Sequence, residues 1–291
     1  MKIVQGDELA WVRGLEYRGG TFHYRNLMEG EPGTIDNFQL SMGRNDKDFV
    51  SPRHRHNFEQ FRFQLEGDLN FARDGVMTPG MLGYFPEGAS YGPQTSEATA
   101  MTIVLQFGGA SGSGYLSRQE VKQGMEELKV FGTFAAGVYR RNDGVPGKRN
   151  QDAYEAIWGH VNNRPLAYPK PRYPGPIMMD SADFSWVPSG QAGVQEKLLG
   201  VFTERRASAR FVRLAAGATL QAAGRGIYVV CSGGGHVAGA PARRFTTLVL
   251  DHGETAAFTA ETDMELLHFG LPDLRDLTAA LPEALPAEAA E

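Results

Sequence analysis

Two histidines separated by a single residue are the first candidates for chemistry in this chain. His54 and His56 lie in the segment Ser51-Pro-Arg-His-Arg-His-Asn-Phe-Glu, which we interpret as part of a β-strand. Because residues i and i+2 of a strand point to the same face, the two imidazoles can bind one metal ion between them. A histidine pair is also common at the surface or in a hydrogen-bonded core, so the residues around this pair decide whether it is a metal site.

The residues after this pair continue at regular intervals. Gln60 follows His56 after three intervening residues, and Gly67 follows Gln60 after six more. This spacing resembles the first motif of the cupin superfamily, in which His-x-His is followed by three or four residues, Glu, six residues and Gly. The chain departs from that motif at Gln60, which stands where the family has a glutamate ligand.

A second set of intervals begins at Gly80. Five residues separate it from Pro86-Glu-Gly88, and two more separate Gly88 from Tyr91. The second cupin motif has the same spacing, with Gly, five residues, Pro-x-Gly, two residues and His. Tyr91 therefore stands where the family has its third histidine ligand. The resemblance extends over about residues 50 to 95.

The resemblance implies an all-β fold of jelly-roll barrels and a divalent metal ion (Fe, Mn, Zn or Ni) in the first barrel. Carried over position by position, the metal ligands would be His54, His56, Gln60 and Tyr91. These four groups are neutral and leave the charge of the ion uncompensated, which favours an anionic substrate that chelates it. A proton drawn off Tyr91 by the ion would add one negative charge to the site.

The strand that follows the histidines has two chemically different faces. The motif spacing indicates which side chains point into the barrel. The inward face carries Gln60, Arg62 and Gln64, and the outward face carries Phe61, Phe63 and Leu65. We therefore expect a polar, ligand-binding interior in this barrel, with the apolar face packed outside it. The alternative is a strand whose apolar face fills the core while its polar face meets water.

Three side chains on this interior are candidates for contact with the substrate. Arg62 and Gln64 are the candidate substrate-binding residues, and Tyr91 and Arg62 are the candidate catalytic residues, as proton donor and anion-orienting group. A buried guanidinium needs an anionic partner, which can be the substrate or a protein carboxylate. The sequence leaves both partners open.

Glu59 is an alternative metal ligand. In place of Gln60 it would restore a set of two histidines and one carboxylate, as in non-haem iron oxygenases. Strand alternation turns it away from the histidines, so this role requires a local distortion such as a β-bulge. Otherwise we expect Glu59 to form a surface ion pair with Arg53 or Arg55.

Further along the chain the pattern changes from strands to helices and back. Short strand-like runs between Gly, Pro, Asn and Asp extend from about residue 20 to 110. A capping box at Ser117 predicts a helix through about Lys129, and a second helix starts at Asp152. The proline-rich segment 164–176 should separate two halves stiffly. The expected units are an N-terminal barrel with the site (1–116), a helical and proline-rich connector (117–193), a C-terminal barrel (194–275) and a frayed acidic tail (276–291).

The second half lacks the candidate ligands. When Gly233 is laid on Gly67 and Gly253 on Gly80, the four ligand positions become Leu220, Ala222, Gly226 and Met264. None of these is a metal ligand apart from the soft thioether. The chain therefore resembles a bicupin with a degenerate second barrel, and we expect the N-terminal barrel alone to carry the site.

Composition limits the partners of this protein. The net charge of −5 and the scattered Lys and Arg of the 291 residues give no basic stripe, so we expect no nucleic-acid partner. The N-terminus has no apolar leader and no long apolar run occurs, so we expect a cytoplasmic protein without a membrane partner. We expect a small-molecule substrate and a homodimer, because the apolar face at Phe61 needs cover.

Three functions remain in competition. The first is a metal-dependent cupin oxidoreductase, such as a dioxygenase, acting on a small anionic oxygenated substrate that is aromatic or dicarbonyl in character. The second is a metal-independent cupin isomerase or epimerase with His54 or His56 as general base and Tyr91 as acid. The third is a bicupin that binds a small molecule without catalysis. Metal content separates the first from the others.

Overall fold

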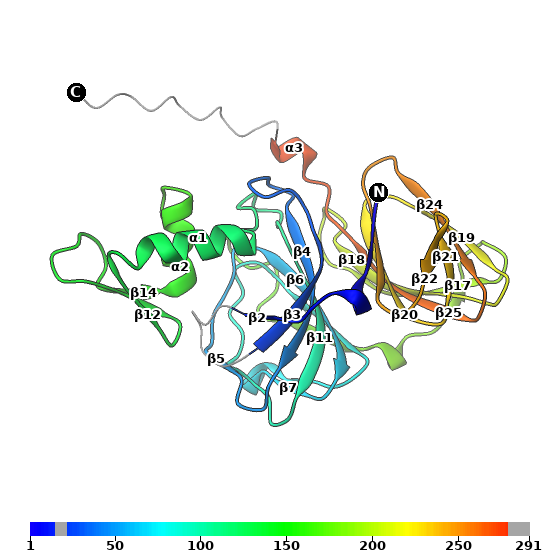
Figure 1. The fold of residues 1–291 in the computed structure, drawn as a ribbon, viewed down its shortest axis with the longest axis horizontal. Coiled ribbons are helices and arrows are strands. Elements are labelled where there is room, and N and C mark those ends of the chain that lie inside the picture. The colour runs from blue at the N-terminus through cyan, green and yellow to red at the C-terminus, as the bar shows by residue number, and fades with distance from the viewer. Residues whose placement is uncertain (15–21, 279–291) are drawn as a thin grey trace.

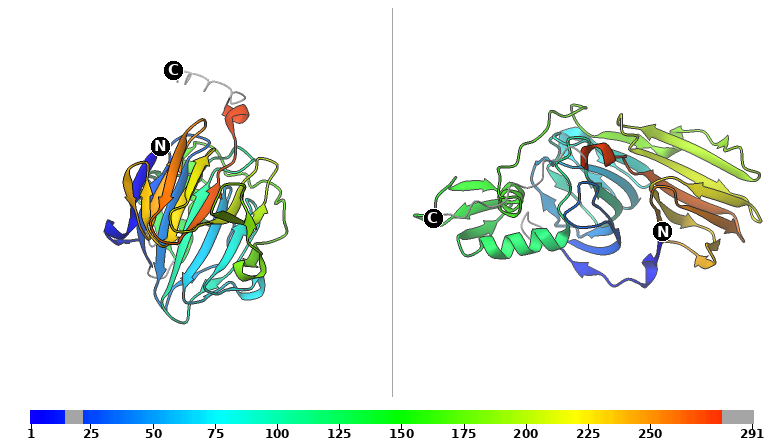
Figure 2. Two further views of the ribbon diagram at one scale, coloured as in Figure 1. Left: turned by 90° about the vertical axis from the view of Figure 1, so that its right-hand side faces the viewer. Right: turned by 90° about the horizontal axis from the view of Figure 1, so that it is seen from above.

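A computed structural model describes residues 1–14 and 22–278 of the chain. It consists of three units arranged in a row, which Figure 1 and the view from above in Figure 2 both show: a helical module, a first β-barrel in the centre and a second β-barrel. The all-β fold of two barrels with few helices is therefore confirmed. Most of the tail expected to fray lies outside the described residues, after the short helix α3 (Arg275–Thr278).

Each barrel is formed by one large and one small antiparallel sheet. In the first barrel the large sheet has the order β15 (Ile177–Asp180), β9 (Met81–Phe85), β6 (Glu59–Glu66), β11 (Ala100–Phe107), β4 (Phe38–Asn45), β3 (Phe22–Glu29) and β2 (Val12–Arg13). Its small sheet has the order β5 (Val50–Ser51), β10 (Gln94–Thr95), β7 (Leu69–Asn70) and β8 (Val76–Met77).

The second barrel repeats this architecture. Its large sheet has the order β1 (Lys2–Gln5), β23 (Thr246–Leu250), β20 (Gly226–Ser232), β25 (Met264–Gly270), β18 (Ser208–Leu214), β17 (Val194–Val201) and β16 (Val187–Pro188). Its small sheet has the order β19 (Thr219–Ala223), β24 (Thr255–Ala260), β21 (Gly235–Val237) and β22 (Ala240–Ala242). Apolar side chains fill its interior, among them Leu220, Ala222 and Met264 at the positions of the expected lost ligands.

Two strands cross the boundaries expected from the sequence. The N-terminal strand β1 pairs with β23 of the second barrel, in a register that places Ile3 opposite Leu248. The connector strand β15 pairs with β9 of the first barrel, with Met178 opposite Gly83. Sheet membership therefore differs from the expected ranges, because each large sheet is completed by a strand from another part of the chain.

The largest apolar core lies between the two barrels. The outward face of β6 packs against the large sheet of the second barrel, where the ring of Phe61 stacks on Phe269 with centroids 5.4 Å apart and Phe63 meets Phe211 at 5.3 Å. Burial of each such ring stabilises the fold by roughly 1.5–3 kcal/mol. The motif therefore predicted correctly which face of β6 points out of the barrel. The same contact covers the apolar face on which the expectation of a homodimer rests. The homodimer stays a prediction.

The helical module lies between the barrels in sequence but beside the first barrel in space. It comprises α1 (Arg118–Leu128), β12 (Gly132–Ala135), β13 (Val138–Arg141), β14 (Asn150–Asp152) and α2 (Ala153–Val161). Ser117 and Glu120 cap α1 reciprocally as predicted, and Asp152 caps α2. Helix α2 packs through Trp158 and neighbouring residues onto a core that includes Phe58 of the first barrel.

The stiff separation expected from the proline-rich segment is wrong, because the two large sheets pack directly against each other. The segment instead follows the surface of both barrels. Its Tyr173 contacts the ring of Tyr84 in the first barrel and donates a hydrogen bond to the carbonyl of Phe202 at 2.9 Å. Within the described residues, no helix has the length and apolar character needed to cross a membrane.

Candidate metal-binding site

A backbone contact joins the two motifs at the first barrel. His54 and Tyr91 form an isolated antiparallel bridge, in which each amide donates to the other residue's carbonyl, at 3.1 Å from His54 and 2.9 Å from Tyr91. Gly88 has φ of +78°, and a side chain there would collide with the carbonyl of Pro169. The motif glycine therefore permits the turn that brings Tyr91 back beside the histidines.

The side chains of these residues converge on one point. The Nε2 atoms of His54 and His56 lie 3.1 Å apart, and the hydroxyl oxygen of Tyr91 lies 3.1 Å from the first and 2.7 Å from the second. The Nδ1 atom of His54 lies 2.6 Å from the carbonyl of Pro52, which can accept a hydrogen bond from Nδ1–H and so leave the Nε2 lone pair facing Tyr91. The structure thus brings together three of the four predicted ligands.

Gln60 completes the group but presents its amide nitrogen. Its Nε2 donates to the Tyr91 hydroxyl at 2.9 Å, and its carbonyl oxygen accepts from Arg62 at 3.3 Å. Gln60 is fully buried and points inward, as predicted. With the amide turned over, the carbonyl oxygen would face the Tyr91 oxygen and the histidines instead.

Arg62 lies beside this group on the inward face of β6. Its guanidinium donates to Gln94 at 2.6 Å and to the Tyr91 hydroxyl at 3.3 Å, and it lies 4.8 Å from the ring centre of Phe85. These hydrogen bonds go to neutral oxygens. They hold the positively charged guanidinium next to the candidate metal ligands.

Gln64 faces inward from the same strand, but its amide is engaged in the protein. The nitrogen donates to the backbone carbonyls of Glu66 and Gly67, at 2.9 and 2.8 Å, and the oxygen accepts from the Thr102 hydroxyl at 2.7 Å. Its role in substrate binding stays a prediction.

Glu59 does not face the histidines. It lies on the other face of β6, is 1% exposed, and has an oxygen 3.5 Å from Nη1 of Arg172. The surface ion pair expected with Arg53 or Arg55 is wrong, because Arg53 pairs with Asp74 and Arg55 lies over the ring of Tyr168. Burial, with repulsion from Glu87 as the next cause, raises the pKa of Glu59 to about 8.

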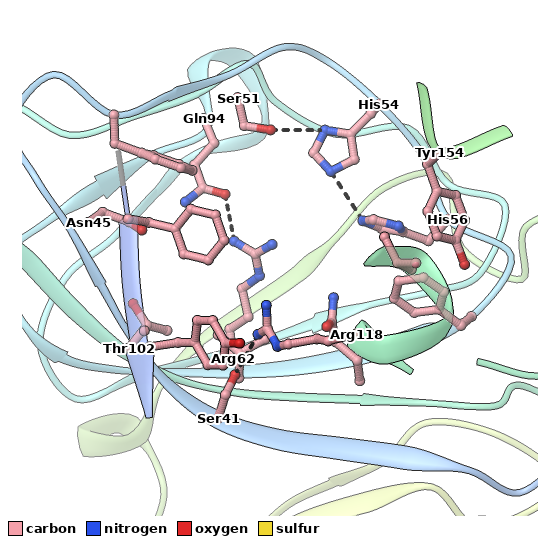
Figure 3. A pocket seen from close by; sticks show the side chains of 18 of the residues that line it. Ser41, Asn45, Ser51, His54, His56, Arg62, Gln94, Thr102, Arg118 and Tyr154 are labelled. Atoms are coloured by element: carbon pink, nitrogen blue, oxygen red, sulfur yellow. Dashed lines mark hydrogen bonds between the residues drawn. The ribbon is translucent and has the colours of Figure 1, made fainter. Parts of the chain in front are cut away.

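A cavity of about 180 Å³ opens in front of His54, His56 and Arg62. This volume is below the range of about 300–1,000 Å³ for drug-sized ligands, so the cavity suits a small molecule. The described residues that line it include no Asp or Glu. Figure 3 shows the two histidines at one end and the Arg62 and Arg118 side chains reaching into the space.

Sequence reasoning missed several of the residues that line this cavity. Gln94, which holds Arg62, lies close to the second motif, and that proximity was the available signal. Arg118 and Tyr154 come from α1 and α2 of the helical module. Neither has a motif that points to the barrel, because their placement depends on how the module packs.

The donor atoms fit a divalent ion in type and spacing. Ligand atoms about 2.0–2.2 Å from one ion lie roughly 3 Å apart, as the Nε2 atoms and the Tyr91 oxygen do here. The described residues contain no cluster of three or more His, Cys, Asp or Glu that could hold a metal, so the set has no carboxylate. His54, His56 and Tyr91 would hold the ion, with Gln60 as the fourth candidate.

Comparison with known proteins gives matches in structure. No family model and no curated protein sequence matches the chain. A structure described as a putative dioxygenase from Nostoc punctiforme PCC 73102 matches with a TM-score of 0.61 and 10% identity, over 92% of this chain and 81% of that one. Oxalate decarboxylase from Bacillus subtilis at pH 4.6 matches with a TM-score of 0.54 and 14% identity, over 96% and 80%.

A third match is GK1651 from Geobacillus kaustophilus, with a TM-score of 0.53 and 13% identity, over 93% of this chain and 95% of that one. At these identities the similarity concerns the fold. The matches extend over both barrels of the chain, and the first barrel holds the two motifs at the spacing described above. The chain therefore has the cupin fold that its motifs predicted.

Proposed function

We propose that this protein is a metal-dependent cupin enzyme, an oxidoreductase of the dioxygenase type, that acts on a small anionic oxygenated substrate in the first barrel. The observation that carries the proposal is the convergence of His54, His56 and Tyr91 at the wall of a cavity lined by no described acid. Two proteins of similar fold support it, one described as a putative dioxygenase and one, an oxalate decarboxylase, with Mn(II) centres.

The roles of the residues follow from their positions. A bound divalent ion would supply Lewis-acid stabilisation of negative charge that develops on the substrate, and redox chemistry if it is Fe or Mn. Arg62 would orient the anionic group of the substrate by charge-assisted hydrogen bonds. The Tyr91 hydroxyl, at 2.7 Å from His56, is placed to hold or deliver a proton at its oxygen.

An anionic substrate follows from the charge of the cavity. Arg62 and Arg118 both line it, and no described Asp or Glu does. A cation added at the histidines would increase the positive potential further, because the ligand set holds no carboxylate. An anion that enters the cavity therefore gains attraction from each of these groups.

Elemental analysis of the purified protein tests the proposal. We expect the wild type to retain a divalent ion after dialysis and His56→Ala to lose it. His236→Ala is the matched control, since His236 is exposed in the second barrel and pairs with Glu261. Equal metal content in the wild type and His56→Ala would contradict the proposal, as would the absence of binding after loading with Fe, Mn, Zn or Ni.

The distance of 2.7 Å between His56 and Tyr91 also favours a second candidate function. These two groups could act as general base and general acid of a metal-independent isomerase or epimerase. Turnover that persists in the presence of a chelator, and in protein shown to be free of metal, would select this function over the first.

A further inference from the structure

Arg118 is a second guanidinium in the cavity, and it comes from outside the barrel. It is the first residue of α1, directly after the cap residue Ser117. Its guanidinium lies 3.8 Å from the ring centre of Tyr24 and donates to the Ser41 hydroxyl at the long distance of 3.4 Å. Its Nε atom is buried and has no hydrogen-bond partner among the described residues. The long bond to Ser41 is the one hydrogen bond described for this guanidinium, so its Nη atoms keep donor capacity toward the cavity.

Protein carboxylates do not neutralise this charge inside the cavity. No Asp or Glu belongs to the described lining residues, and Arg118 forms no ion pair within the described part of the chain. A guanidinium is a planar fork that matches the geometry of a carboxylate and binds it through two parallel hydrogen bonds. The chemistry that Arg118 offers is thus recognition of an anionic group.

The two arginines of the cavity differ in origin and in neighbours. Arg62 belongs to the barrel and lies beside the Tyr91 group, whereas Arg118 belongs to the helical module and lies beside Tyr24 and Ser41. Figure 3 shows both side chains directed into the space. Aromatic rings account for much of the remaining wall: Phe22, Tyr24, Phe49, Phe58, Tyr115 and Tyr154.

We propose that the cavity selects a small dicarboxylate, with one carboxylate at Arg62 and the histidines and the other at Arg118. This inference rests on the proposed function to the extent that the cavity is the substrate site. Arg118 is then a specificity-determining residue, and the helical module distinguishes a dianion from a monoanion. The aromatic walls provide flat apolar surfaces for the body of the molecule.

A purely structural role for Arg118 makes a different prediction. Stacking on Tyr24 and the bond to Ser41 could serve only to attach α1 to the barrel. Loss of that attachment would lower the stability of the protein and weaken all ligands alike. It would leave the ratio between the affinities of a dicarboxylate and a monocarboxylate unchanged, so this ratio is the decisive quantity.

Isothermal titration of the full chain with matched acids tests the proposal. The probes are isophthalate against benzoate and glutarate against butyrate, each titrated into the wild type, Arg118→Gln and Arg118→Lys. We expect the wild type to prefer each dicarboxylate by about 10- to 100-fold, the gain from one added charge-assisted contact. Arg118→Gln should remove most of this preference, because it should weaken isophthalate binding far more than benzoate binding. Arg118→Lys should restore part of it.

A matched control lies on the same helix. Lys122→Gln removes one positive charge from an exposed position of α1 and should leave the preference intact. A wild type without preference for the dicarboxylates overturns the inference, whatever the variants do. If Arg118→Gln keeps the preference, the inference is wrong while the anion site at Arg62 stands. If none of the acids binds the wild type, both the anion site and the inference fail.

Discussion

The hydroxyl oxygen of Tyr91 lies 2.7 Å from Nε2 of His56, although the two residues belong to different motifs. The backbone bridge between Tyr91 and His54 fixes this contact, because it aligns the ends of the two segments. A tyrosine thus occupies the place in space where the motif has a third imidazole. The site exchanges a neutral nitrogen donor for an oxygen that can bind a metal or carry a proton.

Tyr91→Phe should separate metal binding from folding. The ring packs against Phe71 and Phe85, so the variant should stay folded, at a cost of about 1–3 kcal/mol because the buried Gln60 amide loses its acceptor. Loss of the oxygen donor should weaken binding of a divalent ion by about 10-fold or more. Isothermal titration with a divalent metal measures the affinity, and differential scanning calorimetry measures the thermal stability. Tyr115→Phe is the control, because that hydroxyl bonds to Gln39 and Gln106 instead. Unchanged metal affinity in Tyr91→Phe would exclude Tyr91 as a ligand.

Gln60→Glu should strengthen metal binding and weaken an anionic ligand. A carboxylate attracts the ion and repels the anion, but Arg62, whose guanidinium contacts the Gln60 oxygen at 3.3 Å, would pair with part of the new charge. We therefore expect an effect on the order of 1 kcal/mol in each direction. Titration of Mn, Fe or Zn measures the first effect, and titration of benzoate the second.

Gln94→Glu provides a matched comparison for that variant. It places a new carboxylate next to the Arg62 nitrogen that now donates to Gln94. No interaction described for the Gln94 side chain reaches Tyr91. It should weaken the anionic ligand with little gain in metal affinity. Equal metal affinities in the wild type and Gln60→Glu would show that residue 60 does not contribute to the ion site.

Glu59→Gln should make the protein more stable at high pH. The folded protein raises the pKa of Glu59 from the ordinary 4.5 to about 8, so it binds the proton more tightly than the unfolded chain does. The stabilisation from the protonated carboxyl is complete below about pH 4.5 and is lost as the pH rises through about 8. The variant should remove this loss, on the order of 5 kcal/mol at pH 9.

Denaturant titrations of wild type and Glu59→Gln between pH 5 and 9 measure this effect. Glu66→Gln on the same strand is the control, since Glu66 is exposed and should leave the slope of stability against pH as it is. Parallel curves for the wild type and Glu59→Gln would mean that Glu59 ionises freely in the folded protein, in conflict with its burial.

Phe61→Ala should destabilise both barrels together. The ring stacks on Phe107 of its own barrel at 5.5 Å and on Phe269 of the other barrel at 5.4 Å, so its removal leaves a cavity between the two sheets. A loss of about 3–5 kcal/mol in the free energy of unfolding is expected. Val50→Ala, at an exposed position of β5, should cost little. Calorimetry that resolved a shift in one transition and none in another would contradict a shared core.

The sequence allowed prediction of the site where short-range rules determine it. The motif spacing indicates that Gln60 faces the interior. Alternation along β6 then places Arg62 inward and Phe61 outward, as the structure has them. Glu59 was misassigned because its partner Arg172 is 113 positions away, in a segment without regular pattern. Arg118 was missed because helix packing, and not a local motif, brings it to the cavity.

Predictability of the fold has the same limit. Both barrels and both helices follow from strand alternation and capping signals. The pairings of β1 and β15 do not, because strands of four residues carry too little pattern to specify a distant partner.

The exchange of β1 and β15 also determines how the chain can be divided. A fragment that ends in the connector before β15 would retain β1 without its partner β23 and would expose the edge of β9. The complementary fragment would lack the strand that covers β23. Each half would therefore present an open, aggregation-prone sheet edge. The barrel with the candidate site therefore cannot be moved to another protein as a separate module, and its cavity depends on a partner barrel whose corresponding positions hold Leu220, Ala222 and Met264.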